Sequence, residues 1–160
     1  MRPFLRSVIA GAALTTTTLI TAAPASAAVT MPSSSSVTAA AYTGEITAQE
    51  RAIFSDINTY RAEHNVPPIL WENSFHAEAV EWGQAMVDGG FFVHDADALR
   101  FENLFYSARD PLGATEAWID SPGHNAILLD PELRVGAIGV VAGHRPHYGD
   151  GYFVVLRGYY

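Results

Sequence analysis

The sequence predicts a single α+β domain in which a small sheet is layered with helices. Helix-start signals and apolar stripes at helical spacing fill the first part of residues 45–160, and segments rich in Val, Ile and Tyr fill the last part. Helices that come first and strands that come last favour a layered α+β domain over an alternating α/β fold. The length of 160 residues points to one domain, and 49% hydrophobic residues suffice to build its core.

The predicted domain begins with an amphipathic helix. Thr47-Ala48-Gln49-Glu50 is a capping box, in which the hydroxyl and the carboxylate each satisfy a free amide at the helix start. The apolar stripe that follows at helical spacing consists of Ile53, Ile57 and Tyr60. Pro67-Pro68 forbids continuation, so the helix should end near His64-Asn65.

A second helix is predicted from Asn73 to the glycine pair Gly89-Gly90, which tolerates a left-handed stop. Its apolar stripe consists of Phe75, Ala79, Trp82 and Met86. Trp82 is therefore expected in the core, and His76, which lies off the stripe, is expected on the helix surface.

Two shorter helices should follow. Asp110-Pro111 and Ser121-Pro122 each place a good N-cap residue before a proline at the first helical position. This pattern predicts helices over residues 111–120 and 122–129.

The C-terminal part has strand chemistry. Residues 135–142 and 152–160 should pair as an antiparallel hairpin, and residues 103–107 should form a third strand. The long loop expected between the two hairpin strands carries His144 and His147 as exposed residues.

Residues 1–27 have the pattern of a secretory leader. Arg2 and Arg6 give a positive start, residues 8–23 are apolar or weakly polar, and Ala25-Ser26-Ala27 is a small-residue cleavage site. The apolar stretch contains four consecutive threonines and is too short and too polar for a stable membrane span. We therefore expect a secreted, extracellular protein whose mature chain starts at Ala28.

Residues 28–44, rich in Ala, Ser and Thr and almost without charge, should form a disordered spacer before the domain at residues 45–160. The chain has no cysteine, so disulfides and a cysteine nucleophile are excluded. With 17 acidic against 9 basic residues, its surface repels phosphate backbones, and nucleic acid is not an expected partner. It also has neither a G-x-S-x-G elbow nor a phosphate-binding loop.

Several short segments, in this order, resemble the CAP superfamily, also called SCP or PR-1-like, in its short bacterial secreted form. The segments are Asn58-Thr59-Tyr60-Arg61, His64-Asn65, Leu70, His94, Glu102-Asn103-Leu104, Trp118 with Ser121-Pro122-Gly123-His124-Asn125, and Val135-Gly136 with Gly139-Val140. They span nearly all of residues 46–160. The resemblance implies a three-layer α-β-α sandwich with a small antiparallel sheet and a cleft lined by two histidines and, usually, two acidic residues.

In this sequence the matching cleft residues are His94, Glu102 and His124. Phe101 stands where relatives usually have glycine, and Ser121 stands where the second carboxylate is expected. Glu116 and Asp120 lie near that position without matching it.

Two imidazoles and a carboxylate suit Zn²⁺ with an open position, so His94 and His124 are predicted metal ligands and Glu102 is the candidate catalytic base. One interpretation is an extracellular binding or effector module whose ligand is a lipid or sterol, a peptide or an envelope component. The alternative is a metal-dependent, peptidase-like hydrolase in the same cleft, and a third is a structural envelope protein with a vestigial cleft.

Each site residue also has a purely structural interpretation. His124, in a first helical turn, can cap or bridge loops as a neutral imidazole. Asp95 and Asp97, beside His94, can form Asx turns. Glu102, in an apolar strand, requires a buried partner. Solvent-exposed positions suit Glu116 and Asp120, an N-cap suits Ser121, and the core suits Trp118.

Overall fold

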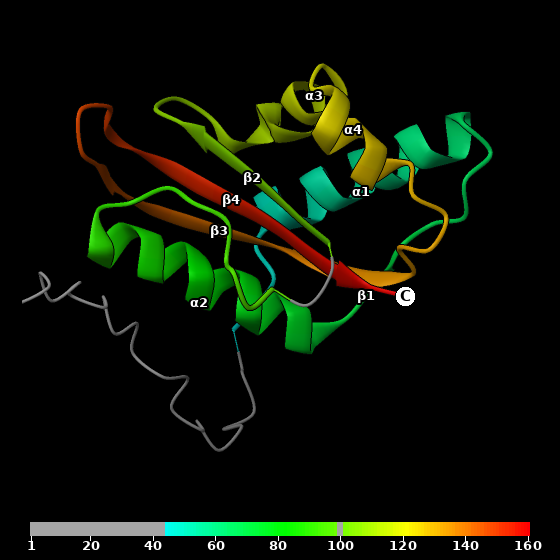
Figure 1. Cartoon of the computed structure of the whole chain (residues 1–160), viewed down its shortest axis with the longest axis horizontal. Helices are drawn as coiled ribbons and strands as arrows, with labels where there is room; N and C mark the ends of the chain where they lie inside the picture. Colours follow the sequence, from blue (N-terminus) through cyan, green and yellow to red (C-terminus); the bar gives the residue numbers. More distant parts are fainter. Residues whose placement is uncertain (1–43, 99–100) are drawn as a thin grey trace, which may run out of the picture. The chain divides into compact units, whose positions relative to one another are not determined.

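The computed structural model describes residues 44–98 and 101–160. The predicted leader, residues 1–27, and all but the last residue of the predicted spacer lie outside the described residues. The elements follow in the order α1 (Ala48–Glu63), β1 (Leu70–Trp71), α2 (Asn73–Gly89), β2 (Phe101–Ser107), the 3₁₀ turn η1 (Pro111–Gly113), α3 (Ala114–Ile119), α4 (Pro122–Leu128), β3 (Val135–Arg145) and β4 (Gly149–Tyr159) (Figure 1).

The four strands form one sheet in the order β1-β3-β4-β2. β4 pairs antiparallel with both β3 and β2, as predicted for the hairpin and the third strand. The sheet is nevertheless mixed, because the two-residue strand β1 pairs parallel with β3 through Leu70 and Val135. β2 is thus an edge strand, and β4 lies in the interior of the sheet.

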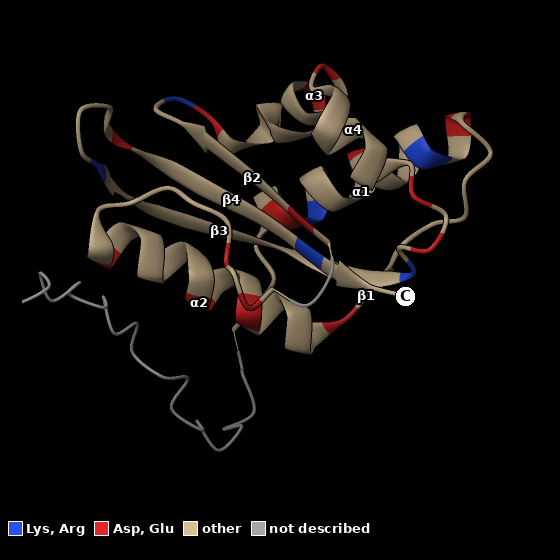
Figure 2. Cartoon of the chain, viewed as in Figure 1, with Lys and Arg blue, Asp and Glu red and all other residues tan. Residues whose placement is uncertain are grey.

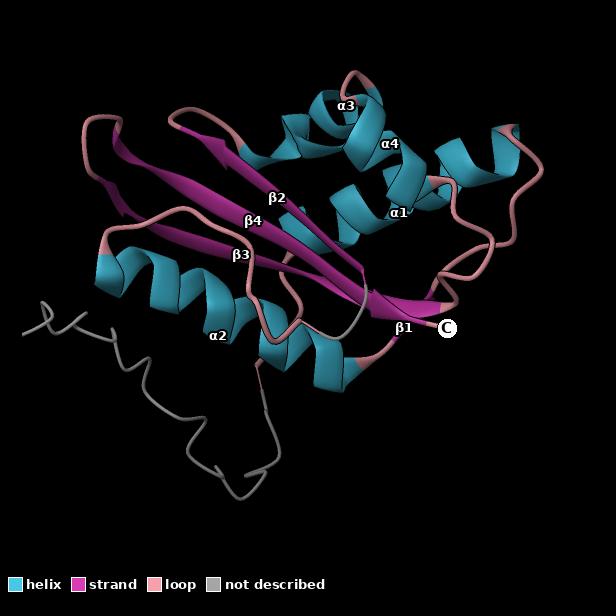
Figure 3. Cartoon of the chain, viewed as in Figure 1, coloured by secondary structure: helices cyan, strands magenta, loops and turns pink. Residues whose placement is uncertain are grey.

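Helices cover both faces of this sheet (Figures 1 and 3). α2 packs on one face against β3 and β4, while α1, α3 and α4 lie on the other. Successive residues of a strand point to opposite faces, so β4 supplies both cores. Val154 and Leu156 join the core on the side of α1, and Phe153 and Val155 join the core on the side of α2. The predicted three-layer α-β-α sandwich is confirmed.

Gly139 of β3 allows the α2 backbone to approach the sheet closely. A Cβ atom on Gly139 of β3 would lie 2.6 Å from the backbone nitrogen of Val80 and 2.7 Å from the carbonyl carbon of Ala79. Only a residue without a side chain lets the helix backbone approach a strand this closely.

The local predictions at the helix starts agree with the structure. In the capping box, Thr47 Oγ1 accepts from the Glu50 amide at 3.1 Å, and Glu50 Oε2 accepts from the Thr47 amide at 2.8 Å. α2 begins at Asn73, and Asp110 accepts from the amide of Leu112 at 2.9 Å. Ser121 occupies the N-cap position of α4, but its side chain makes no capping hydrogen bond.

The hairpin differs from the prediction at its tip. β3 extends to Arg145 and β4 starts at Gly149, so the connection is a tight turn rather than a long loop. His144 therefore lies in β3, and His147 lies in the turn with a φ of 68°.

The prediction that His76 lies on the surface of its helix is wrong. The residue is 1% exposed, and its Nε2 atom lies 3.1 Å from Glu50 Oε1. The same oxygen of Glu50 accepts from the amide of Val140 at 3.0 Å. The first turns of α1 and α2 thus meet at a buried polar contact, which a single-helix pattern does not reveal. Within residues 44–98 and 101–160, no helix is long and apolar enough to cross a bilayer.

Candidate functional site

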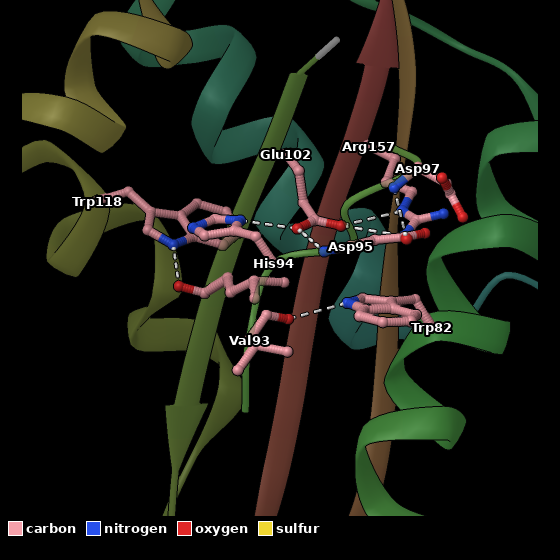
Figure 4. A network of polar contacts seen from close by, with 9 residues as sticks. Trp82, Val93, His94, Asp95, Asp97, Glu102, Trp118 and Arg157 are labelled. Carbon is pink, nitrogen blue, oxygen red and sulfur yellow. Dashed lines mark hydrogen bonds and ion pairs between the residues drawn. The ribbon is translucent and has the colours of Figure 1, made fainter. Parts of the chain in front are cut away.

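The predicted cleft residue Glu102 lies at the centre of a buried charge cluster (Figure 4). Its carboxylate is 6% exposed and sits on β2 directly opposite Arg157 of β4. Arg157 donates to Glu102 Oε2 from Nε at 3.2 Å and from Nη2 at 3.0 Å. A buried carboxylate requires such a partner because both charges have left water.

The segment after α2 completes the cluster. The amide of Asp95 donates to Glu102 Oε1 at 3.1 Å, and Asp95 Oδ2 lies 2.6 Å from Arg157 Nη2. Asp95 Oδ1 accepts from the amide of Asp97 at 3.0 Å, which is the predicted Asx turn. The Trp82 indole of α2 donates to the carbonyl of Val93 at 3.2 Å and holds this segment against the helix (Figure 4).

His94 projects from the same segment onto Glu102. Its Nδ1 atom lies 2.7 Å from Glu102 Oε1, while the side chain is 60% exposed. Glu102 accepts two hydrogen bonds from Arg157 on Oε2 and one from the Asp95 amide on Oε1, so its carboxylate acts as an acceptor. His94 Nδ1 therefore carries the proton, and in the neutral ring Nε2 keeps the free lone pair.

His124 approaches from the opposite layer. It lies half-buried in the first turn of α4, and its carbonyl accepts from Asn103 Nδ2 at 3.1 Å. Burial, and then the charge of nearby His94, lower the pKa of the His124 imidazole below its usual value. Glu102 and Asn103 are consecutive in β2 and point to opposite faces, so this pair connects the His94 segment with α4.

The other three candidate cleft residues, Glu116, Asp120 and Ser121, lie on the segment just before His124. Glu116 and Asp120 are exposed on and just after α3, and Ser121 starts α4. In the part of the chain that the structure describes, none of the three forms a hydrogen bond or ion pair with His94, Glu102 or His124. Glu116 instead lines an open groove of about 370 Å³, whose other lining residues are Asp56, Thr59, Tyr60, Glu63, Leu112, Thr115 and Ile119. Trp118 is a core residue, as predicted, and donates to the carbonyl of Leu104 at 3.0 Å.

Sequence reasoning missed Arg157. One signal was present, since Arg157 is the single charged residue after four apolar residues of β4, and an arginine in such a strand needs a buried acceptor. Its partner depends on the register between β2 and β4, which the sequence does not state.

The geometry only partly fits the predicted metal set. Glu102 already accepts four hydrogen bonds, two on each oxygen, and has little capacity left for a cation. Among residues 44–98 and 101–160, no group of three or more His, Cys, Asp or Glu side chains is arranged to hold a metal ion. The remaining candidate ligands are the imidazoles of His94 and His124. Two ligands are fewer than the three or four that zinc sites in proteins ordinarily use.

The three-layer α-β-α sandwich is the architecture that the resemblance implied, and the contact between His94 and Glu102 lies at its edge strand β2. Residues 54–157 match the profile of the CAP, or cysteine-rich secretory protein, family. The chain belongs to this family, although it contains no cysteine.

Two solved structures with TM-scores above 0.5 share the fold. An outer surface protein from Borrelia burgdorferi is 15% identical, covers 72% of this chain and 96% of its own, and superposes with a TM-score of 0.55. MpPR-1i is 12% identical over 68% of this chain and 84% of its own, with a TM-score of 0.54. An extracellular SCP-domain protein from Bacillus anthracis is 21% identical over 72% of this chain and 45% of its own, with a TM-score of 0.49. Comparison with curated proteins gave no significant match.

Proposed function

We propose that this protein is exported and acts outside the cell as a binding module, and that His94 and His124 form its ligand site at the β2 edge. The observation that carries the proposal is that both carboxylate oxygens of Glu102 are already occupied by hydrogen bonds. A carboxylate that accepts four hydrogen bonds from His94, Asp95 and Arg157 holds its neighbours in place. It is poorly suited to activate a water molecule, so this site supports binding better than the alternative of a metal-dependent hydrolase.

The two imidazoles are the proposed ligands for a divalent cation such as Zn²⁺. Glu102 orients His94 through Nδ1 and leaves Nε2 available, which is the usual role of a carboxylate beside a metal-binding histidine. The lowered pKa of His124 keeps that ring neutral near pH 7, as ligation requires. A bound zinc ion would attract carboxylate, carbonyl or similar donors of the extracellular ligand.

Of the three ligand classes considered, a peptide or an envelope component suits this pair best. Two protein ligands leave zinc coordination to be completed from outside, and carboxylate or carbonyl groups do so readily. A sterol offers a single hydroxyl group and would gain little from such a cation.

Calorimetric titration with Zn²⁺ tests the proposal, using the purified protein and a His94→Ala/His124→Ala double variant. His144→Ala is the matched control, because His144 is 66% exposed and its Nδ1 lies 2.8 Å from Asp150 Oδ1, much like the His94 contact. We expect saturable binding that is lost in the double variant and retained in the control. No binding by the wild type, or equal binding by the double variant, would remove the metal from the proposal and leave lipid and peptide ligands to be screened without it.

A further inference from the structure

A second arrangement of chemical groups lies at the β3–β4 turn. The guanidinium carbon of Arg145, the last residue of β3, lies 4.0 Å from the ring centroid of Tyr148, 4.3 Å from that of Phe92 and 5.0 Å from that of Tyr106. Figure 2 shows a basic segment at this end of the hairpin. Three aromatic rings from three separate segments thus surround one cation, and their negative faces attract it.

The rings are fixed by their own contacts. Tyr106 of β2 donates through its hydroxyl to the carbonyl of Gly149 at 2.6 Å, and its ring lies 5.1 Å from that of Phe153. A Cβ atom on Gly151 would lie 2.8 Å from the Tyr106 hydroxyl oxygen, so the glycine leaves room for this contact. The Tyr148 amide donates to the carbonyl of Arg145 at 3.0 Å in the turn, and the Tyr148 ring lies 6.2 Å from that of Tyr106 in an edge-on contact. The cage formed by Phe92, Tyr106 and Tyr148 therefore holds Arg145 in a defined position.

Within residues 44–98 and 101–160, the hydrogen-bond donors of Arg145 have no protein acceptor. In the part of the chain that the structure describes, no carbonyl or carboxylate pairs with its guanidinium. Two buried arginines behave differently: the Arg61 guanidinium donates to four backbone carbonyls, and that of Arg157 donates three hydrogen bonds to two carboxylates. The aromatic rings thus lie against the guanidinium of Arg145, while its N–H groups make no hydrogen bond to the described residues.

We propose that Arg145 and its aromatic cage form an oxyanion-binding site that takes a carboxylate or phosphate group of a ligand. The planar fork of arginine matches either group with two parallel hydrogen bonds. Because the rings already restrict the side chain, less conformational freedom is lost when the anion binds. Asp150, near the start of β4, contacts His144 and forms no hydrogen bond with Arg145, so its carboxylate does not occupy the proposed site.

This site does not rest on the proposed zinc site. The exposed ring of Tyr148, at 62%, lies beside the guanidinium and offers an apolar surface to the body of the ligand. The segment after α2 carries Phe92, which contacts Arg145, and His94, which contacts Glu102. This segment therefore contributes a residue to each of the two proposed sites.

Titration with inorganic phosphate and with acetate tests the site. Binding is followed by NMR through the backbone amides of residues 147–150 in wild type, Arg145→Gln and Arg145→Lys. Arg109→Gln is the control, because Arg109 is an exposed arginine without a ring contact in the described chain. A parallel titration of the His94→Ala/His124→Ala variant separates this site from the zinc site.

We expect saturable shifts in the wild type, the control and the double histidine variant. Arg145→Gln should weaken binding by at least about tenfold, and Arg145→Lys should weaken it less because it keeps the charge and loses the fork. A response to phosphate alone assigns a phosphate-bearing ligand, and a response to acetate alone assigns a carboxylate. Absence of saturation with both probes, an unchanged affinity in Arg145→Gln, or equal weakening in Arg109→Gln would overturn the proposal.

Discussion

Replacing Glu102 by glutamine removes the charge at the centre of the cluster while keeping the size of the side chain. The new amide still has one oxygen for the His94 and Asp95 donors. Its NH₂ group then faces the guanidinium of Arg157, donor against donor, where Oε2 accepted bonds of 3.0 and 3.2 Å. Hydrogen bonds to charged groups contribute about 1.5–3 kcal/mol each, and breaking one side of a buried ion pair costs about 3–5 kcal/mol.

Asp95 keeps its contact with Arg157 in this variant, so the guanidinium retains one partner. We therefore expect a loss of about 3 kcal/mol in the free energy of unfolding, at the lower end of that range, and a fall in melting temperature of roughly 10 °C. Urea unfolding followed by circular dichroism measures the first quantity, and a thermal scan measures the second.

The matched control is Asp150→Asn. Asp150 also contacts a histidine at 2.8 Å, but it is 92% exposed, so its loss should change stability by less than about 0.5 kcal/mol. A Glu102→Leu/Arg157→Met double variant should recover part of the loss, because it removes both buried charges together. If Glu102→Gln unfolds within about 1 kcal/mol of the wild type, the reasoning that this pair is desolvated is wrong.

Four further outcomes are expected. Arg61→Lys should destabilise by about 2–4 kcal/mol in urea unfolding, since an ammonium has three donors and cannot span four carbonyls 2.6–3.0 Å from the guanidinium. Because the pKa of His124 is lowered in the fold, the unfolded chain binds its proton more readily, and stability should fall as pH drops below about 6.5; His124→Gln should lose this part of the slope when urea midpoints are compared at about pH 7.5 and pH 5.5. Gly139→Ala should cost at least about 2 kcal/mol through its clash with the α2 backbone, whereas Gly123→Ala, which meets nothing within 4 Å, should be nearly neutral in the same assay. Mass analysis of protein recovered from the medium should find Ala28 at the N-terminus, and an intact leader would contradict the export prediction.

The sequence predicted most helix ends and strand positions, because these depend on contacts within a few residues. Thr47 and Glu50 form their capping box three positions apart, and Asp110 caps the helical turn directly after it. The segments that resemble the CAP family also predicted that His94, Glu102 and His124 share one region. The direct contact between His94 and Glu102 agrees with that expectation, while their roles in binding stay predictions.

Only the tertiary structure decided what surrounds those residues. Arg157 and Glu102 are 55 positions apart in the sequence, and the register between β2 and β4 brings them together. A shift of one strand by one residue would turn its side chain to the core on the other face of the sheet. His76 is buried because α1 brings Glu50 to it, although its own helix pattern places it outside the apolar stripe. The cage around Arg145 is assembled from a loop, a strand and a turn. Local sequence determines which element a residue joins, whereas the partners of a buried charge depend on how separate elements pack, because the distances between them are set by the whole fold.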